Sequence, residues 1–169
     1  MKLGFNGELT TATFPSNPQL EQDFPNLANS GYEITSDPSD VPNCIGYALY
    51  DMRHFWDPDA AALRVRGYYW PPGISLDWEL DTITEIFALH GYQVCADSRF
   101  ENGYEKIALY LTNNEVSHVA RQLIDGKWTS KLGPDEDISH NTVEALEGDI
   151  LLFPLAYGKA VRIMRRPRQ

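Results

Sequence analysis

The chain has 169 residues, of which 43% are hydrophobic and 22% are charged, and it carries a formal net charge of -10 with an isoelectric point near 4.7. A domain of this length and composition buries enough surface to fold without a disulfide or a metal. An acidic chain repels nucleic acid, and the sequence lacks the apolar run of about 18 residues that a membrane-spanning helix needs, so neither nucleic acid nor a membrane is an expected partner.

The first quarter of the chain has no regular pattern. Residues 1–42 are rich in proline, asparagine, serine and aspartate, and their apolar residues follow neither helical nor strand periodicity. We therefore expect an irregular N-terminal arm over residues 1–42 and a single domain over residues 43–169. The first residues also lack the apolar core of a signal peptide, which predicts a cytoplasmic location.

A helix is predicted directly after this arm. Asn43 is a favourable N-cap, and apolar residues recur at helical spacing from Ile45 to Phe55. Pro58 ends the pattern, because proline cannot continue a helix that has already begun.

A loop and a second helix come next. Residues 67–73 are aromatic and contain two prolines, so they predict a loop. Either Ser75 or Asp77 caps the following helix, whose apolar stripe ends at Gly91.

The second half of the chain changes to the alternating pattern of strands. Asn113-Asn114 and Asp125-Gly126 are turn signals that separate three strands of an antiparallel meander. Helices followed by a meander predict an α+β fold. The expected strands cover residues 92–96, 105–112, 117–124, 127–132, 148–153 and 159–164, with a short helix over residues 141–147.

Cys44 is the first candidate for chemistry. At the first helical position its thiol faces unpaired backbone N–H groups and the positive end of the helix dipole. These groups favour the nucleophilic thiolate and can hold the oxyanion of a tetrahedral intermediate. The alternative is a small buried side chain at a helix start. Cys95 lies in a short apolar run and is interpreted as a core thiol.

Four histidines are the candidates for a general base. His118 opens a strand just after a turn, a position that can present an imidazole to a nucleophile on a neighbouring helix. His54 and His90 lie near predicted helix ends, where the helix dipole alone favours histidine. His140 follows the acidic residues 135–137 and can simply pair with them. The carboxylates of Glu101, Glu105, Asp135 and Asp137 are expected to be solvated.

No metal and no cofactor are expected. The six cysteines and histidines include no two that are fewer than five positions apart, whereas zinc ligands usually come in close pairs. Glycine-rich phosphate loops and the G-x-S-x-G motif of serine hydrolases do not occur.

Two segments resemble the papain-like superfamily in its compact bacterial form, the NlpC-like and CHAP-like amidohydrolases. Residues 42–48 (PNCIGYA) are similar to their nucleophile helix, and residues 117–130 (SHVARQLIDGKWTS) to their base-bearing hairpin. Shared strings from Asn43 to His140 also resemble a family of uncharacterised bacterial proteins. The resemblance implies a papain-like, NlpC-like fold, in which a nucleophile helix packs on an antiparallel meander, with Cys44 as nucleophile and His118 as base.

The resemblance also implies a third residue that orients the histidine. In the superfamily this residue is commonly His, Asn, Gln or Asp on the next strand, and the chain departs from all four. The turn decides whether Ser130 or Lys131 takes the position, and Ser130 is favoured because lysine offers no acceptor. Asp137 and His140 are the reserve candidates.

The expected function is a cysteine-dependent hydrolase or acyl-transferase that acts on a peptide, protein or other amide substrate. Asn43, Tyr69 and Trp70 are candidates for the substrate groove, although aromatic residues also fill cores. The negative net charge favours a cationic or neutral substrate. The alternative function is a non-catalytic protein-binding or regulatory module on the same scaffold, and the residues do not separate peptidase, deamidase, isopeptidase and transglutaminase chemistry.

Overall fold

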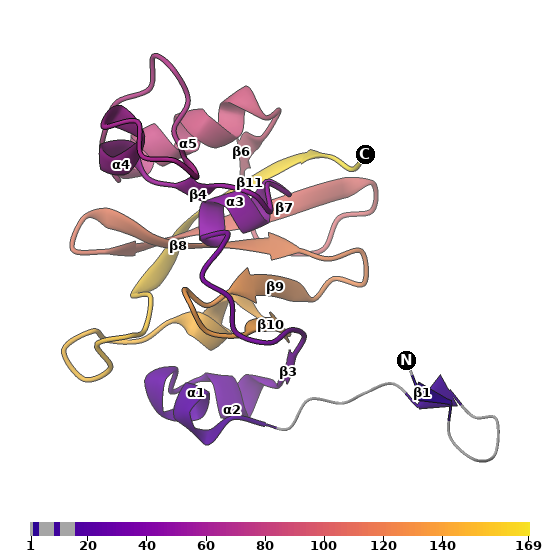
Figure 1. Cartoon of the computed structure of the whole chain (residues 1–169). Helices are drawn as coiled ribbons and strands as arrows, with labels where there is room; N and C mark the ends of the chain where they lie inside the picture. The colour runs from indigo at the N-terminus through magenta and orange to yellow at the C-terminus, as the bar shows by residue number, and fades with distance from the viewer. Residues whose placement is uncertain (1, 4–8, 11–15) are drawn as a thin grey trace.

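The computed structural model describes residues 2–3, 9–10 and 16–169, and its main feature is a seven-stranded sheet in which every pair of neighbours is antiparallel (Figure 1). The strand order is β3-β10-β9-β8-β7-β11-β6. The strands are β3 (Tyr32–Ile34), β6 (Gln93–Cys95), β7 (Tyr104–Thr112), β8 (Glu115–Gln122), β9 (Trp128–Lys131), β10 (Asp137–His140) and β11 (Lys159–Pro167).

Short elements complete the fold. Two strand pairs lie outside the large sheet: β1 (Lys2–Leu3) with β2 (Leu9–Thr10), antiparallel, and β4 (Phe55–Trp56) with β5 (Tyr68–Tyr69), parallel. The helices are α1 (Pro18–Asp23), α2 (Leu27–Ser30), α3 (Cys44–Ala48), α4 (Pro58–Ala62), α5 (Leu80–Leu89) and the 3-10 helix η1 (Val143–Leu146). The fold is therefore a mixture of helices with an antiparallel sheet, as the α+β prediction requires.

The sheet has a buried core on each face. Along β7, Ala108 and Tyr110 pack with α1, α2 and η1, in what we call the α1–α2 core. Ile107 and Leu109 pack with residues of α3 and α5 on the opposite face, in the α3–α5 core. This follows from the alternation of side chains along a strand, and Figure 1 shows α1 and α2 below the strands and α4 and α5 above them in the view.

The predicted meander is confirmed. Asn113 and Asn114 both have positive φ (50° and 65°) in the turn between β7 and β8, and Gly126 (φ 88°) lies in the turn between β8 and β9. The strand predicted over residues 148–153 is wrong. There Asp149 accepts the amide N–H of Leu151 through its carboxylate and that of Phe153 through its carbonyl, and these local bonds form turns instead of a ladder.

Helix α3 is much shorter than the predicted helix, which extended to Pro58. Tyr50 adopts a left-handed conformation (φ 63°), and the amide of Asp51 bonds back to the carbonyl of Gly46 at 2.9 Å. The carboxylate of Asp51 then accepts the amides of Arg53 and His54, so the chain leaves the helix in a turn. Proline does not simply end a helix here, because Pro58 is the first residue of α4.

Helix α5 is confirmed with a later start. It begins at Leu80, after Asp77 has accepted the amide of Glu79 through its side chain. Gly91 (φ 86°) follows its end, as predicted.

Part of the N-terminal segment differs from the expected irregular arm, because residues 18–34 contain α1, α2 and β3, whereas residues 35–42 form no helix or strand. Leu20, Phe24 and Leu27 are buried in the α1–α2 core, and β3 pairs with β10. Helices of six and four residues are too short to show a periodic pattern, which explains the difference. The expectations for residues 1, 4–8 and 11–15 lie outside the described residues.

Candidate active site

Helix α3 is held in place by Asn43, its N-cap. The Oδ1 atom of Asn43 accepts the amides of Gly46 (3.3 Å) and Trp56 (3.2 Å), and its Nδ2 atom donates to the carbonyl of Trp56 (2.7 Å). This side chain is buried, and it joins the start of α3 to β4. Asn43 therefore positions the residue that follows it.

Cys44 is half-buried where α3 packs on β8 and β9. Burial raises the pKa of its thiol to about 11, although the backbone amides of Val119, Ile45 and Cys44 itself act to lower it. A five-residue helix has too few aligned peptide groups for its dipole to reverse this. The resting residue is therefore a neutral thiol at neutral pH, in contrast to the thiolate that its helix-start position predicts.

Three predicted residues form a hydrogen-bonded chain. The Nε2 atom of His118 lies 2.9 Å from the Oγ atom of Ser130, and that oxygen lies 2.8 Å from the Nε2 atom of His140. The Nδ1 atom of His140 lies 2.8 Å from the carbonyl oxygen of Thr142, which only accepts, so this nitrogen carries the proton. All three side chains belong to neighbouring strands and are buried.

The hydrogen bonds through Ser130 to His140 fix the tautomer of His118. Neutral His140 must accept at Nε2, so the Ser130 hydroxyl donates to it and in turn accepts the Nε2–H of His118. The Nδ1 atom of His118 is then unprotonated, and it has no hydrogen-bond partner among the residues that the structure describes. Burial lowers the pKa of His118 well below its ordinary value, and neighbouring His140 lowers it further. His118 is thus a neutral base with one available nitrogen.

Cys44 lies close to this chain but is not bonded to it. The amide of Val119, the residue next to His118, is one of the groups near the thiol. The ring of Tyr157 stacks on His118 with centroids 4.2 Å apart, and burial followed by the nearby Cys44 raises the pKa of Tyr157. Over residues 16–169, no hydrogen bond joins the thiol to the imidazole. The side chain of His118 packs with the α1–α2 core, whereas Cys44 packs against the α3–α5 core.

Residues 33–165, which are more than half of the chain, match a family described as a domain of unknown function, DUF7689. The chain belongs to this family. No curated protein and no solved structure matches it. The matched DUF7689 range contains Cys44, His118, Ser130 and His140, but a family of unknown function transfers no activity to them.

The remaining predicted residues lie elsewhere. Trp70 is buried in the α3–α5 core, where its indole N–H donates to the carbonyl of Ser75 at 2.9 Å. Tyr69 is 38% exposed and lines a small pocket of about 290 Å³ with His54 and His90. Asp137 pairs with the ammonium group of Lys131 at 3.7 Å and is not part of the chain from His118.

The expectation that all the carboxylates are solvated is wrong for Glu105, which is 4% exposed. It accepts hydrogen bonds from the hydroxyls of Tyr50 and Tyr92 and pairs with Arg166 at 3.1 Å. Burial raises the pKa of Glu105, but the two tyrosines and then Arg166 outweigh it, so the pKa is lowered. The alternation of β7 could have predicted this burial, because Glu105 lies two residues before Ile107 and therefore on the same face, that of the α3–α5 core.

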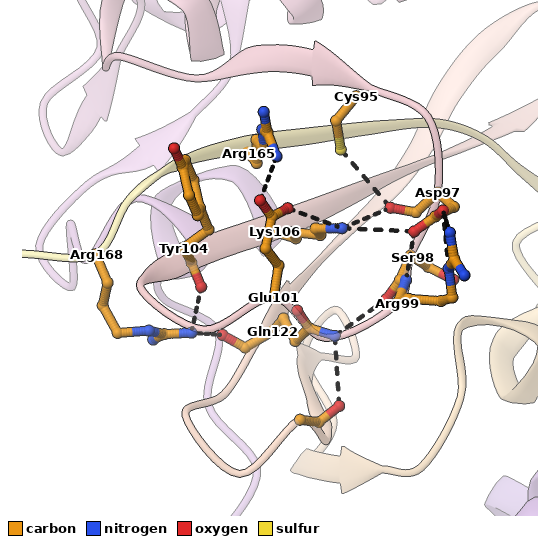
Figure 2. A network of polar contacts seen from close by, with 11 residues as sticks. Cys95, Asp97, Ser98, Arg99, Glu101, Tyr104, Lys106, Gln122, Arg165 and Arg168 are labelled. Atoms are coloured by element: carbon orange, nitrogen blue, oxygen red, sulfur yellow. Dashed lines mark hydrogen bonds and ion pairs between the residues drawn. The ribbon is translucent and has the colours of Figure 1, made fainter.

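A second ionic group surrounds Lys106, the residue that follows Glu105 in the sequence (Figure 2). The nearly buried ammonium group of Lys106 lies between Asp97 and Glu101, at 3.6 and 3.7 Å from their carboxylates, and Arg165 pairs with Glu101 at 2.5 Å. The arginines of β11 thus neutralise acidic neighbours. Among the described residues, no group of three or more Cys, His, Asp or Glu side chains is placed to hold a metal, and no described helix is long and apolar enough to cross a membrane.

Proposed function

We propose that the chain is a cysteine-dependent hydrolase or acyl-transferase that acts on an amide or peptide-like bond, with Cys44 as nucleophile and His118 as base. The observation that carries the proposal is the pair of hydrogen bonds that connects His118 through Ser130 to His140. It leaves the Nδ1 atom of a neutral imidazole unprotonated at the residue that precedes Val119, whose backbone amide is near the thiol. Buried polar atoms usually have a hydrogen-bond partner, so a purely structural role does not explain why the Nδ1 atom of His118 has none among the described residues.

The proposed reaction starts from two neutral groups. The Sγ atom of Cys44 attacks the carbonyl carbon while its proton passes to Nδ1 of His118, and nearby backbone amides hold the oxyanion. His118 then returns the proton to the leaving nitrogen, the C–N bond breaks, and an acyl thioester remains on Cys44. Water or an acceptor amine attacks this thioester, which releases the acid or the new amide and restores the thiol.

In this proposal Ser130 takes the position of the orienting residue of the papain-like superfamily. A hydroxyl that is itself bonded to His140 fixes the tautomer of His118, although it brings no negative charge to stabilise an imidazolium. The order of a cysteine that opens a helix, a histidine on a strand and a polar residue on the next strand supports an NlpC-like arrangement. The proposal also requires a rearrangement that brings the thiol and Nδ1 of His118 together when substrate binds, because the two side chains pack on opposite faces of the sheet at rest.

The competing proposal is a non-catalytic protein-binding module on the same scaffold. Two observations favour it: the thiol of Cys44 is neutral at rest, and no hydrogen bond connects it to His118. In that case the acidic surface of the chain binds a protein partner with a basic face, and Cys44 is a structural residue.

Acylation of Cys44 by p-nitrophenyl acetate separates the two proposals. We expect an initial burst of nitrophenolate and an acetylated Cys44 peptide by mass spectrometry, with no burst in Cys44→Ala. Cys95→Ala is the matched control and should keep the full burst. His118→Gln should slow acylation by at least about 100-fold, the usual contribution of a general base.

The opposite result favours the binding module. If Cys44 is acetylated no faster than free cysteine, or at the same rate in wild type and His118→Gln, the enzyme proposal fails. Near-ultraviolet circular dichroism of each variant shows whether the fold is intact, so that a loss of rate is not mistaken for unfolding.

A further inference from the structure

A groove of about 470 Å³ is lined by residues of β4, β5 and the segments around them. Asn43, which directly precedes Cys44 in the sequence, is part of this lining. The other residues that matter for its chemistry are Val41, Arg53, Phe55, Arg66 and Tyr68.

Part of the groove is apolar. Val41 is 43% exposed and Tyr68 is 39% exposed, which is a large exposure for side chains of this kind. The rings of Phe55 and Tyr68 lie 5.5 Å apart because β4 and β5 pair these two residues directly. An aromatic pair of this kind offers a surface to an apolar side chain of a ligand.

The same groove carries an excess of positive charge. Arg53 and Arg66 line it and form no ion pair with any residue of the described part of the chain. The acidic residue of its lining is Asp40. The ion-paired arginines, by contrast, are Arg99, Arg162, Arg165, Arg166 and Arg168. In a chain with net charge -10, two guanidinium groups without a carboxylate partner attract an anion locally.

Lys131 holds the walls of the groove together from inside. Its ammonium group donates to the carbonyls of Ser39 (2.6 Å), Gly133 (2.7 Å) and Asp135 (3.0 Å). These carbonyls belong to the segment that leads into Val41 and to the loop that contributes Gly133 and Pro134 to the lining. The side chain of Lys131 is 1% exposed, so the groove exists before any ligand binds, which lowers the entropic cost of binding.

We infer that this groove binds a peptide that carries a carboxylate next to an apolar side chain, and that it presents the amide bond of that peptide to Cys44. The carboxylate pairs with Arg53 and Arg66, and the apolar side chain packs on Phe55 and Tyr68. The inference deepens the proposed function and rests on it. It also replaces the substrate charge expected from the net charge, because the charges that line a groove act on its ligand more strongly than the total does.

Two matched alkylating peptides test the inference: bromoacetyl-phenylalanyl-glutamic acid amide and its glutamine analogue. Each forms a thioether when Sγ of Cys44 displaces bromide, and the two differ only in one carboxylate. We expect the acidic probe to alkylate Cys44 about tenfold faster, since its carboxylate adds two surface ion pairs. The preference should vanish in the double variant Arg53→Gln, Arg66→Gln and persist in Lys127→Gln, which removes a charge outside the groove.

Iodoacetamide, together with calorimetric binding of the acetyl forms of both peptides, keeps the two proposals apart. Equal rates and equal affinities for the acidic and neutral peptides overturn the groove inference, whatever iodoacetamide shows. If iodoacetamide labelling of Cys44 still depends on His118 in that case, the proposed function survives. If Cys44 reacts with no reagent but the acidic peptide binds through Arg53 and Arg66, the groove stands as a binding site and the enzyme proposal fails.

Discussion

The sheet contains two buried polar networks that work in opposite ways. The chain from His118 through Ser130 to His140, on β8, β9 and β10, contains no charge, and burial lowers the pKa of His140 to about 4. The network around Glu105, on β7 and β11, holds a buried carboxylate between two tyrosine hydroxyls and Arg166. The comparison teaches that an imidazole stays neutral here because no carboxylate lies in its network.

The largest effect is expected from breaking the charged network. Glu105→Gln preserves shape but leaves the mostly buried guanidinium of Arg166 without its counter-ion. Removing one partner of a buried ion pair usually costs about 3–5 kcal/mol, so we expect a loss of about 3 kcal/mol in the free energy of unfolding. Urea denaturation measures it. A loss below about 1 kcal/mol would mean that Tyr50 and Tyr92, and not the charge, dominate the site.

Acid should weaken the neutral network first. Unfolded histidines titrate near pH 6.5, whereas His140 does so near 4 in the folded protein and His118 is also lowered. The unfolded state therefore binds more protons between these values, and stability is full above pH 6.5 and falls as the pH drops toward 4. Each histidine contributes a slope of up to about 1.4 kcal/mol per pH unit.

The substitution His140→Gln isolates one share of this slope. Urea denaturation at pH 6.5 and 5 should show a smaller loss of stability in the variant than in wild type, by about 1.4 kcal/mol per unit. Lys127→Gln, a substitution outside the hydrogen-bonded chain of His118, Ser130 and His140, serves as the control. Equal slopes in wild type and His140→Gln would show that His140 is not held neutral.

A smaller effect is expected from Ser130→Ala. The substitution removes one hydroxyl and leaves the Nε2 atoms of two buried histidines without a partner, at a cost of about 1–3 kcal/mol. The more specific result is the tautomer: the ¹⁵N shifts of His118 should indicate a pure Nε2–H form in wild type and a mixture in the variant. An unchanged tautomer would transfer the orienting role from Ser130 to another group.

The smallest effect is expected at the exposed end of the charged region. Arg99 pairs with Asp97 at 2.7 Å, but its side chain is 87% exposed (Figure 2). Solvent screens such a pair, so Arg99→Gln should leave the urea midpoint unchanged within error. A clear shift would mean that the surface pairs near Lys106 stabilise that buried ammonium group.

The sequence predicts the fold well where the pattern is long and fails where elements are short. The strands β7 and β8 alternate over nine and eight residues, and the asparagine turn after β7 and the Asp125-Gly126 turn before β9 indicate the order of the meander. The four-residue β10 and the helices α1 and α2 offer no such pattern. Helix α3 was predicted too long because the turn at Asp51 competes with a helical pattern that continues through it.

The hydrogen bond between His118 and Ser130 was predictable, but the protonation of the candidate residues was not. Hairpin geometry indicates Ser130 as a partner of His118, and the hydrogen bond between them is present. The contact with His140 arises from strand pairing across the unpredicted β10. The raised pKa of Cys44 results from burial by residues distant in sequence, which no local motif reports. The role of Glu105 was missed because a carboxylate was assumed to be exposed.

The place of β3 at the margin of the sheet has one more consequence. It covers the otherwise unpaired hydrogen-bonding edge of β10, and residues Tyr32–Ile34 achieve this with only three paired positions. A strand edge left open invites pairing with another chain. Proteolysis or truncation that removes this short segment would therefore make the four-residue β10 the edge strand of the sheet and leave its backbone groups available to another chain.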